Sequence, residues 1–319
     1  MVAAVKRTLN LPGAKLIMAF ASVYLVWGST YLAIRFAIES IPTFLMAGSR
    51  FLISGILVYI YLRIRGRAKP TLKEWKIESF VGLLLLALAN GSVVMAEHTV
   101  PSGLAALMVA TVSLWMVLLN WLWNKTERPN FGIVSGIVIG FVGLIILVDP
   151  QNISGGTSVD PFGAFLLLFA AFMWAAGSVY SKTAHHPKSP MISASMQMIS
   201  GGIFLLLFSA LNGEFSDLNL SLVSVKSSLS LGYLIFFGSI IGFGSYVYIL
   251  RHASPAHVST YAYVNPVIAV LLGWFFADEI VDERILIAAT FIIFSVILIT
   301  KFRNGKKEPA DHDIPKTTE

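Results

Sequence analysis

Two short polar segments join long apolar runs in this sequence, and both carry titratable side chains. The first, AEHTVPSG, covers residues 96–103, and the second, RHASPA, covers residues 251–256. Glu97 and His98 are residue types that take up and release protons, because burial raises the pKa of a carboxyl and histidine titrates near neutrality. We therefore expect Glu97 and His98 either to carry protons or, since the apolar run before Glu97 is short, to be hydrated at a surface.

A single arginine lies inside an apolar run. Arg50 comes about eight residues into the run of residues 43–62, which is roughly 10 Å of depth along a helix. An unpaired guanidinium at that depth in a membrane is costly, and Glu39 and Glu97 are the candidate partners. We expect Arg50 to pair with Glu97 in one state and to help close an outer gate. The alternatives are a permanent structural ion pair and a side chain that reaches up to the surface.

Polar and aromatic side chains recur four residues apart inside several runs, so the members of each pair share one helix face. Aromatic rings with a few amides and hydroxyls are typical of a small-molecule pocket. We predict that ten residues line one cavity for a small-molecule substrate, and the alternative for any single one is helix packing. They are the pairs Trp27 and Tyr31, Thr111 and Trp115, Trp174 and Ser178, and Tyr261 and Asn265, together with Asn90 and Tyr246.

Several kinds of chemistry lack the residues that they need. The sequence contains no Cys, which excludes disulfides and thiol chemistry. Inside the apolar runs, His and carboxylates do not cluster as a metal site requires, and no nucleophile stands beside a base. We therefore expect neither an enzyme nor a bound metal or cofactor. His185 and His186 lie in a basic loop and are predicted to be solvated.

The elements that hold these residues are predicted to be membrane-spanning helices. Hydrophobic residues make up 56% of the chain and charged residues only 13%, against roughly 25% charged in soluble domains. Apolar runs of about 20 residues, the length that spans a bilayer, recur along the chain. We predict an all-α integral membrane protein in a lipid bilayer, with ten transmembrane helices at residues 16–37, 43–62, 79–98, 101–123, 131–148, 161–182, 191–211, 230–250, 255–276 and 284–301.

The charges near the ends of these runs predict the orientation of the helices. All but four of the 23 Lys and Arg residues lie before the first predicted helix, near the ends of the even-numbered ones or at the C-terminus. The opposite connections hold acidic residues such as Asp160 and Glu279. Because cytoplasmic loops are rich in Lys and Arg, we expect both termini to be cytoplasmic, in a bacterial inner membrane. The net charge of +6 then reflects orientation, and no nucleic-acid partner is expected.

The two halves of the chain align with one another. Trp27 aligns with Trp174, and the two polar segments place His98 over His252. Five helices in each half is an odd number, so the second half must enter the membrane inverted, an arrangement typical of alternating-access transporters. The predicted parts are a cytoplasmic N-terminus 1–15, a five-helix repeat 16–148, an extracytoplasmic linker 149–160, a second repeat 161–302 and a disordered cytoplasmic tail 303–319.

Four segments carry a family resemblance. They are WGSTYLAIRFAIES from Trp27, AGSRFLISGIL from Ala47, AEHTVPSGLAALMVATVSL from Ala96 and YAYVNPVIAVLLGWFFADE from Tyr261. Over about residues 15–303 the chain resembles the ten-span EamA-type exporters of the drug/metabolite transporter superfamily. The resemblance implies a central cavity surrounded by the first, third, fourth, sixth, eighth and ninth helices. Family members usually end the fourth and ninth helices in a Gly-Glu-type motif; Asp278-Glu279 fits the ninth, but the fourth reads Asn124-Lys125.

These observations predict a secondary transporter, and in particular an exporter of amino acids or related small metabolites, proton-coupled if Glu97 titrates. One alternative, an exchanger of sugar phosphates or nucleotide-sugars, needs fixed positive charge, and the fourth and ninth helices have no internal Lys or Arg. The other, a multidrug cation efflux protein, is expected to use an acid in the first helix, which has none before Glu39. An inverted repeat favours a carrier over a channel.

One further pattern concerns helix packing. Gly132, Gly136 and Gly140 recur every four residues in the fifth predicted helix and form one face of small side chains. Such a face permits close approach of a second helix. We expect it to pack either on the tenth helix of the same chain or across a homodimer.

Overall fold

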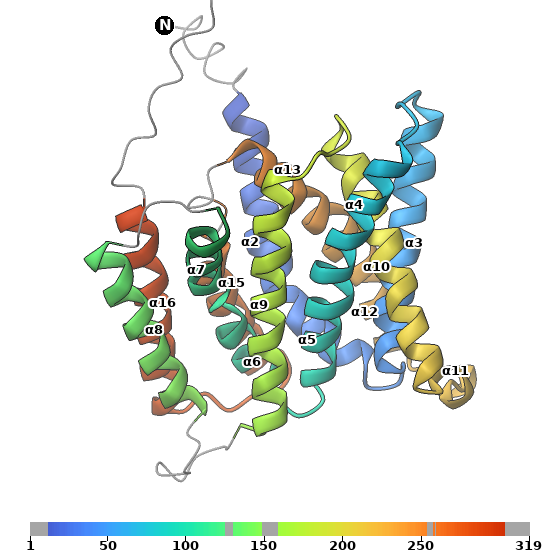
Figure 1. The fold of residues 1–319 in the computed structure, drawn as a ribbon. Helices are drawn as coiled ribbons and strands as arrows, with labels where there is room; N and C mark the ends of the chain where they lie inside the picture. The colour runs from blue at the N-terminus through green and yellow to red at the C-terminus, as the bar shows by residue number, and fades with distance from the viewer. Residues whose placement is uncertain (1–11, 125–129, 149–158, 254–257, 259, 304–319) are drawn as a thin grey trace, which may run out of the picture.

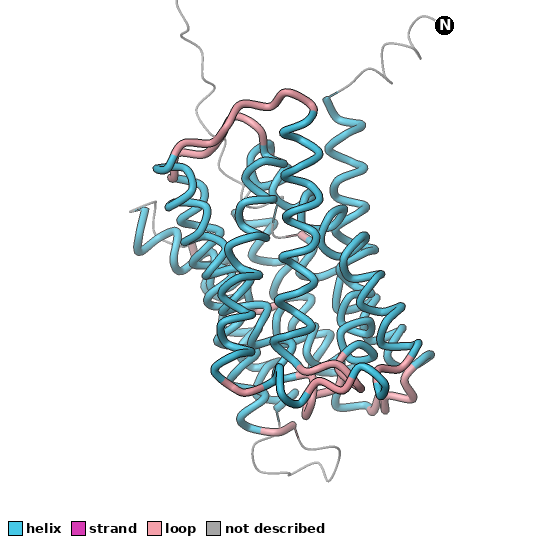
Figure 2. The backbone as a smooth tube through the Cα atoms, turned by 90° about the vertical axis from the view of Figure 1, so that its right-hand side faces the viewer, coloured by secondary structure: helices cyan, strands magenta, loops and turns pink. Residues whose placement is uncertain are grey.

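The structure, a computed structural model, describes residues 12–124, 130–148, 159–253, 258 and 260–303. Within these ranges the backbone forms helices joined by turns and loops, with no strand (Figure 2). The long helices run between two ends of the molecule, where the loops gather. The predicted all-α class is thus confirmed. Most of the predicted N-terminal segment, linker and tail, and Ser254–Ala256 of the second polar segment, lie outside the described residues.

The first half of the chain supplies five membrane spans. The third span is built from three consecutive helical segments and the fourth from two. In order, the helices are α2 (Pro12–Ala37), α3 (Thr43–Ile64), α4 (Leu72–Gly82), η1 (Leu83–Asn90), α5 (Gly91–Ala96), α6 (Ser102–Val109), α7 (Val112–Asn124) and α8 (Phe131–Val148).

The second half supplies five more spans, and its first helix α9 runs in the direction opposite to α2 (Figure 1). Its eighth span is again composite, from three segments, and two short helices precede it. In order, the helices are α9 (Pro161–Thr183), α10 (Pro190–Leu211), α11 (Glu214–Asp217), η2 (Leu220–Leu222), α12 (Val225–Tyr233), η3 (Leu234–Phe243), α13 (Gly244–His252), α15 (Tyr261–Phe276) and α16 (Glu283–Arg303).

Length and hydropathy support ten spans. Seven of the described segments are long and apolar enough to cross a membrane, α8 and α15 contain shorter apolar helices, and α16 adds 21 residues. The predicted ends of the third and eighth spans were wrong by several residues. The third begins at Leu72 because Thr71 and Glu74 form a capping box, in which each side chain bonds the other's backbone N–H. The helix therefore continues through a charged turn that hydropathy alone excludes.

Two π-helical segments were not predicted. They are η1 in the third span and η3 in the eighth, which are equivalent positions in the two repeats. A π-helical turn widens the helix and shifts the direction of its side chains, and such turns are frequent at functional sites. Here η1 carries Asn90, and η3 carries Gly238 and Ser239.

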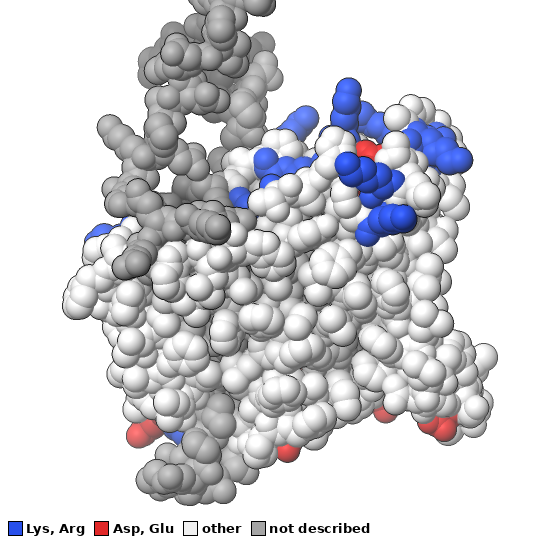
Figure 3. Space-filling model, in the orientation of Figure 1, with Lys and Arg blue, Asp and Glu red and all other residues white. Residues whose placement is uncertain are grey.

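Charged side chains divide the surface into two faces separated by an uncharged band. Lys and Arg gather at one end of the molecule, which we call the basic face, and most of the visible Asp and Glu lie at the other, the acidic face (Figure 3). The α2 helix begins at the basic face and ends at the acidic face. The uncharged band between them matches the hydrocarbon layer of a membrane.

The glycine face of α8 packs against α16 within the chain. A Cβ at Gly136 would lie 2.7 Å from Ile299, and one at Gly140 would lie 2.7 Å from the Ser295 hydroxyl. Gly132 makes the same kind of approach to Phe302. Of the two packings expected for this face, the one on the tenth helix is present, since α16 occupies it, and a homodimer through these glycines stays a prediction.

Candidate functional site

A cavity lies between the two halves of the bundle. The space between its lining atoms is about 660 Å³, a figure that includes volume open to solvent. Six of the ten predicted cavity residues line it, as does Arg50, which had been predicted as a gate residue. The lining consists of Trp27, Thr30, Tyr31, Ile34, Arg50, Phe51, Leu86, Ala89, Asn90, Val93, Val109, Ala170, Trp174, Gly238, Phe243, Tyr261 and Asn265.

Four aromatic side chains form a cluster at the end of the cavity nearer the basic face. The ring of Trp27 lies 5.3 Å from Trp174, 5.0 Å from Tyr246 and 5.6 Å from Tyr261, between ring centroids. Ser178 and Tyr246 lie behind the lining, where their hydroxyls are 2.6 Å apart and Trp174 donates to the Tyr246 oxygen. The cluster comes from α2, α9, α13 and α15, so it joins the first repeat to the second.

Arg50 is buried in the lining, with 3% of its surface exposed. Its Nε donates to the Ser239 hydroxyl at 2.9 Å, and its guanidinium lies over the Phe51 ring at 4.6 Å. Its Nη1 has no hydrogen-bond partner among the described residues. No ion pair joins Arg50 to Glu97 in this part of the chain, so that pairing stays a prediction for another conformation. Glu39 pairs instead with Lys226 at the surface.

Two amides complete the polar part of the lining. Asn90 comes from η1, and Asn265 comes from α15 directly before the helix-interior Pro266. The Oδ1 atoms of both amides are buried and lack a hydrogen-bond partner among the described residues. A buried acceptor without a partner is costly, so such groups commonly receive a hydrogen bond from a ligand or water.

Glu97 and His98 lie outside the lining, in the turn between α5 and α6. Both carboxylate oxygens of Glu97 are buried and have no hydrogen-bond partner among the described residues. Burial, assisted by the charge of Glu279, raises the pKa of Glu97 well above its ordinary value, against the effect of Arg35 and Arg50. His98 contacts the Thr43 hydroxyl at 2.7 Å, and burial lowers its pKa. Burial therefore favours the protonated form of this acid.

Thr111 and Trp115 do not line the cavity, and the prediction for them is corrected. Trp115 packs edge-on against Phe141 of α8 and Phe172 of α9. The Thr111 hydroxyl bonds the Met108 carbonyl in its own helix. Their predicted face assumed a continuous helix, whereas i→i−3 hydrogen bonds tighten the backbone between α6 and α7 and rotate the residues that follow.

Beyond the cavity, a carboxylate joins the two repeats at the acidic face. Glu279, between α15 and α16, accepts hydrogen bonds from the backbone N–H and hydroxyl of Ser102, both at 2.7 Å, and from the N–H of Gly103 at 2.9 Å. These are the first residues of α6, whose N–H groups have no partner within the helix. Arg35 of α2 lies 3.4 Å away. We call these four residues the acidic-face network.

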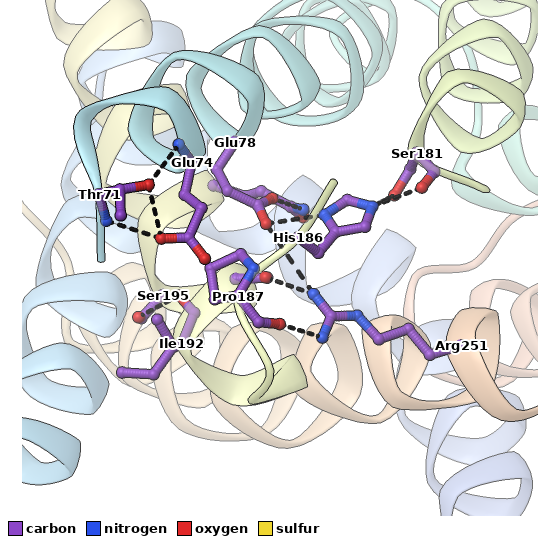
Figure 4. A network of polar contacts seen from close by, with 11 residues as sticks. Thr71, Glu74, Glu78, Ser181, His186, Pro187, Ile192, Ser195 and Arg251 are labelled. Atoms are coloured by element: carbon purple, nitrogen blue, oxygen red, sulfur yellow. Dashed lines mark hydrogen bonds and ion pairs between the residues drawn. The ribbon is translucent and has the colours of Figure 1, made fainter. Parts of the chain in front are cut away.

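A second buried carboxylate joins the repeats at the basic face (Figure 4). Glu78 of α4 is fully buried and accepts from Gln197 of α10 at 2.5 Å and from Nδ1 of His186 at 2.8 Å. Arg251 of α13 lies 3.9 Å away and also bonds the Pro187 carbonyl. Glu78, His186, Gln197 and Arg251 are called the basic-face network.

His186 is part of this network, not a solvated loop residue as predicted. Its Nε2 donates to the Ser181 carbonyl while its Nδ1 faces the Glu78 carboxylate. Two acceptors at opposite ring nitrogens favour the doubly protonated imidazolium. Burial lowers the pKa of His186, but the hydrogen bond and charge of Glu78 outweigh it, and the pKa is raised overall. The neighbouring His185 is exposed.

Residues 14–149 and 161–301 match the EamA-like transporter family, one match to each half of the chain. The chain belongs to the EamA-like transporter family. This EamA-like protein is 41% identical over 284 residues to the uncharacterized inner membrane transporter YedA of Escherichia coli (strain K12), spanning 88% of this chain and 89% of that protein. The family and this relative identify a membrane transporter, not an enzyme.

Two other similarities bear on the fold and on relatives of this EamA-like transporter. A probable amino-acid metabolite efflux pump of Salmonella typhimurium is 27% identical over 262 residues, covering 79% of this chain and 85% of that protein. One solved crystal structure shares the fold with a TM-score of 0.66 at 18% identity, over 91% of this chain and 99% of that chain. With the family match, the fold is that of ten spans in two inverted repeats.

Proposed function

We propose that this transporter exports small organic metabolites, amino acids or related compounds, by alternating access between its two repeats. The observation that carries the proposal is the placement of the two networks. Each joins an element of the first repeat to elements of the second, and they lie at opposite faces of a cavity that the repeats share. A carrier must open one face while it holds the other closed, which two such contacts at opposite ends allow.

The direction and location of transport follow from charge and from relatives. The positive-inside rule supports a cytoplasmic basic face, and with it cytoplasmic termini, in a bacterial inner membrane. The name of the Salmonella relative supports an outward, amino-acid-like cargo. Glu97 supplies a buried acid for proton coupling, since it can exchange its proton when the acidic face opens.

A ligand-binding measurement tests this function. A ligand that binds the folded state raises its Tm by mass action, by an amount that grows with concentration. We expect amino acids at millimolar concentration to raise the Tm of the detergent-purified protein. The shift should vanish in Asn265→Ala, which alters the lining, and persist in Asn212→Ala, an exposed amide at the end of α10. A shift only with sugar phosphates or only with cationic dyes would contradict the proposed substrate class.

A further inference from the structure

The cavity contains one fixed positive charge and no fixed negative charge. Arg50 is the one Lys or Arg among the described lining residues, and none of these residues is Asp or Glu. Ser239 holds its Nε, and Gly238 leaves room for its Nη2, because a Cβ at that glycine would lie only 2.9 Å from this atom. The guanidinium is therefore positioned, yet no carboxylate among the described residues forms an ion pair with it, and the charge of Glu97 acts on it only from beyond contact distance.

A buried guanidinium with no carboxylate in contact is costly, and a ligand anion would lower that cost. Taking a charge out of water costs several kcal/mol unless it is paired, and Arg presents a planar fork of N–H donors that matches a carboxylate. Nη1 is the donor of Arg50 that is buried and unpaired. A permanent structural ion pair would have filled this position, so the arrangement favours a ligand that arrives and leaves.

The same cavity offers acceptors for a positively charged group. The Oδ1 atoms of Asn90 and Asn265 are buried, unpaired and carried by residues of the lining. An ammonium group has donors and no acceptor, which complements these two carbonyl oxygens. A compound with a carboxylate and an amino group carries the groups that complement the Arg50 donor and the two amide acceptors.

We propose, on the basis of the proposed function, that Arg50 binds the carboxylate of the transported compound and that Asn90 and Asn265 accept hydrogen bonds from its amino group. Ser239 acts as a positioning residue, because it bonds Arg50 and is not among the residues that line the cavity. The aromatic cluster then packs against the side chain of the compound. A single guanidinium balances a carboxylate monoanion, whereas the phosphate dianion of a sugar phosphate would leave charge unbalanced in a buried site.

The test compares ligands that differ only in the carboxylate. The affinities of L-alanine, L-leucine and L-phenylalanine are measured by calorimetry on the full-length purified protein, each beside its primary amide, with glycerol phosphate as the phosphate probe. A charge-assisted hydrogen bond contributes enough for the wild type to prefer each acid over its amide by about 10- to 100-fold. We expect Arg50→Gln to bind acid and amide equally, and Arg50→Lys to keep part of the preference.

The ratio of the affinities for acid and amide distinguishes a residue that contacts the ligand from a residue that acts as a gate. A substitution that shifts the protein between open and closed states scales the affinities of acid and amide together and leaves their ratio unchanged. Arg251→Gln is the matched control, because it removes a guanidinium of the basic-face network outside the cavity lining. We expect it to keep the wild-type ratio, and a ratio that fell in Arg251→Gln as far as in Arg50→Gln would overturn the assignment.

Each remaining outcome also bears on the assignment of Arg50. If Arg50→Gln lost affinity for acid and amide alike, Arg50 would act as a gate and the inference would fall. If the wild type bound amides as tightly as acids, or glycerol phosphate more tightly than either, carboxylate recognition would be wrong while the transporter function stood. If no amino acid or amide bound, the proposed substrate class and this inference would fall together.

Discussion

Replacing Glu279 with alanine is expected to destabilise the acidic face and to open the cavity toward it. The variant loses three hydrogen bonds to the start of α6 and the contact with Arg35, and it leaves two helix N–H groups unpaired. Removing one partner of a buried charged contact costs about 3–5 kcal/mol. We expect the lower end of this range, because Arg35 is 36% exposed and its ion pair is screened by solvent.

The opening can be measured with a single cysteine, because the chain contains none. Ala170 lines the cavity and is close to cysteine in size. In an Ala170→Cys background, Glu279→Ala should increase labelling from the acidic face by an impermeant maleimide at least tenfold, which about 1.4 kcal/mol produces. Asp278→Asn is the control, since asparagine tolerates the positive φ of that position. Unchanged labelling together with an unchanged Tm would show that Glu279 does not keep the acidic face closed.

Replacing Glu78 with glutamine is expected to act on the opposite face. The neutral amide cannot balance Arg251 or the His186 imidazolium, and Glu78 is fully buried, so the free energy of unfolding should fall by about 3 kcal/mol. The same Ala170→Cys reporter should then label faster from the basic face and no faster from the acidic face.

The matched control for this second variant lies one turn earlier on the same helix. Glu74 is half-buried and belongs to the capping box of α4, which glutamine preserves. Glu74→Gln should therefore leave both Tm and labelling unchanged. Faster labelling from both faces in Glu78→Gln would indicate loss of structure, and it would contradict a face-specific closing role for the basic-face network.

Features set by local sequence were predicted well. The ten spans follow from apolar runs of bilayer length, and the inverted arrangement follows from five runs in each half. The cavity position of Trp27, Asn90 and Asn265 also follows, because polar and aromatic groups inside a membrane helix face other helices. Each of these features depends on a pattern that is visible along the sequence.

Features set by contacts between distant segments were missed. Glu78 stands beside several lysines and arginines and looks solvated, yet its partners lie more than 100 residues later at His186 and Gln197. Glu279 was noted as an acidic residue of a connection and as part of the family motif, but its bond with Ser102, 177 positions away, was not predicted. The wrong prediction for Trp115 had a different cause. The turn between α6 and α7 rotates the residues that follow it, and this turn depends on packing. One signal was available: Glu78 is one of the few acids close to a face rich in Lys and Arg.

The central claim, that the two repeats carry a small metabolite across the membrane by alternating access, is tested most directly by solute counterflow. Proteoliposomes are preloaded with an unlabelled amino acid that raises the Tm, and entry of the labelled compound is followed with and without the preload. We predict saturable entry that the preload accelerates, and its loss in Asn265→Ala. Entry that neither saturates nor responds to the preload would contradict the account, because it is the behaviour of a channel.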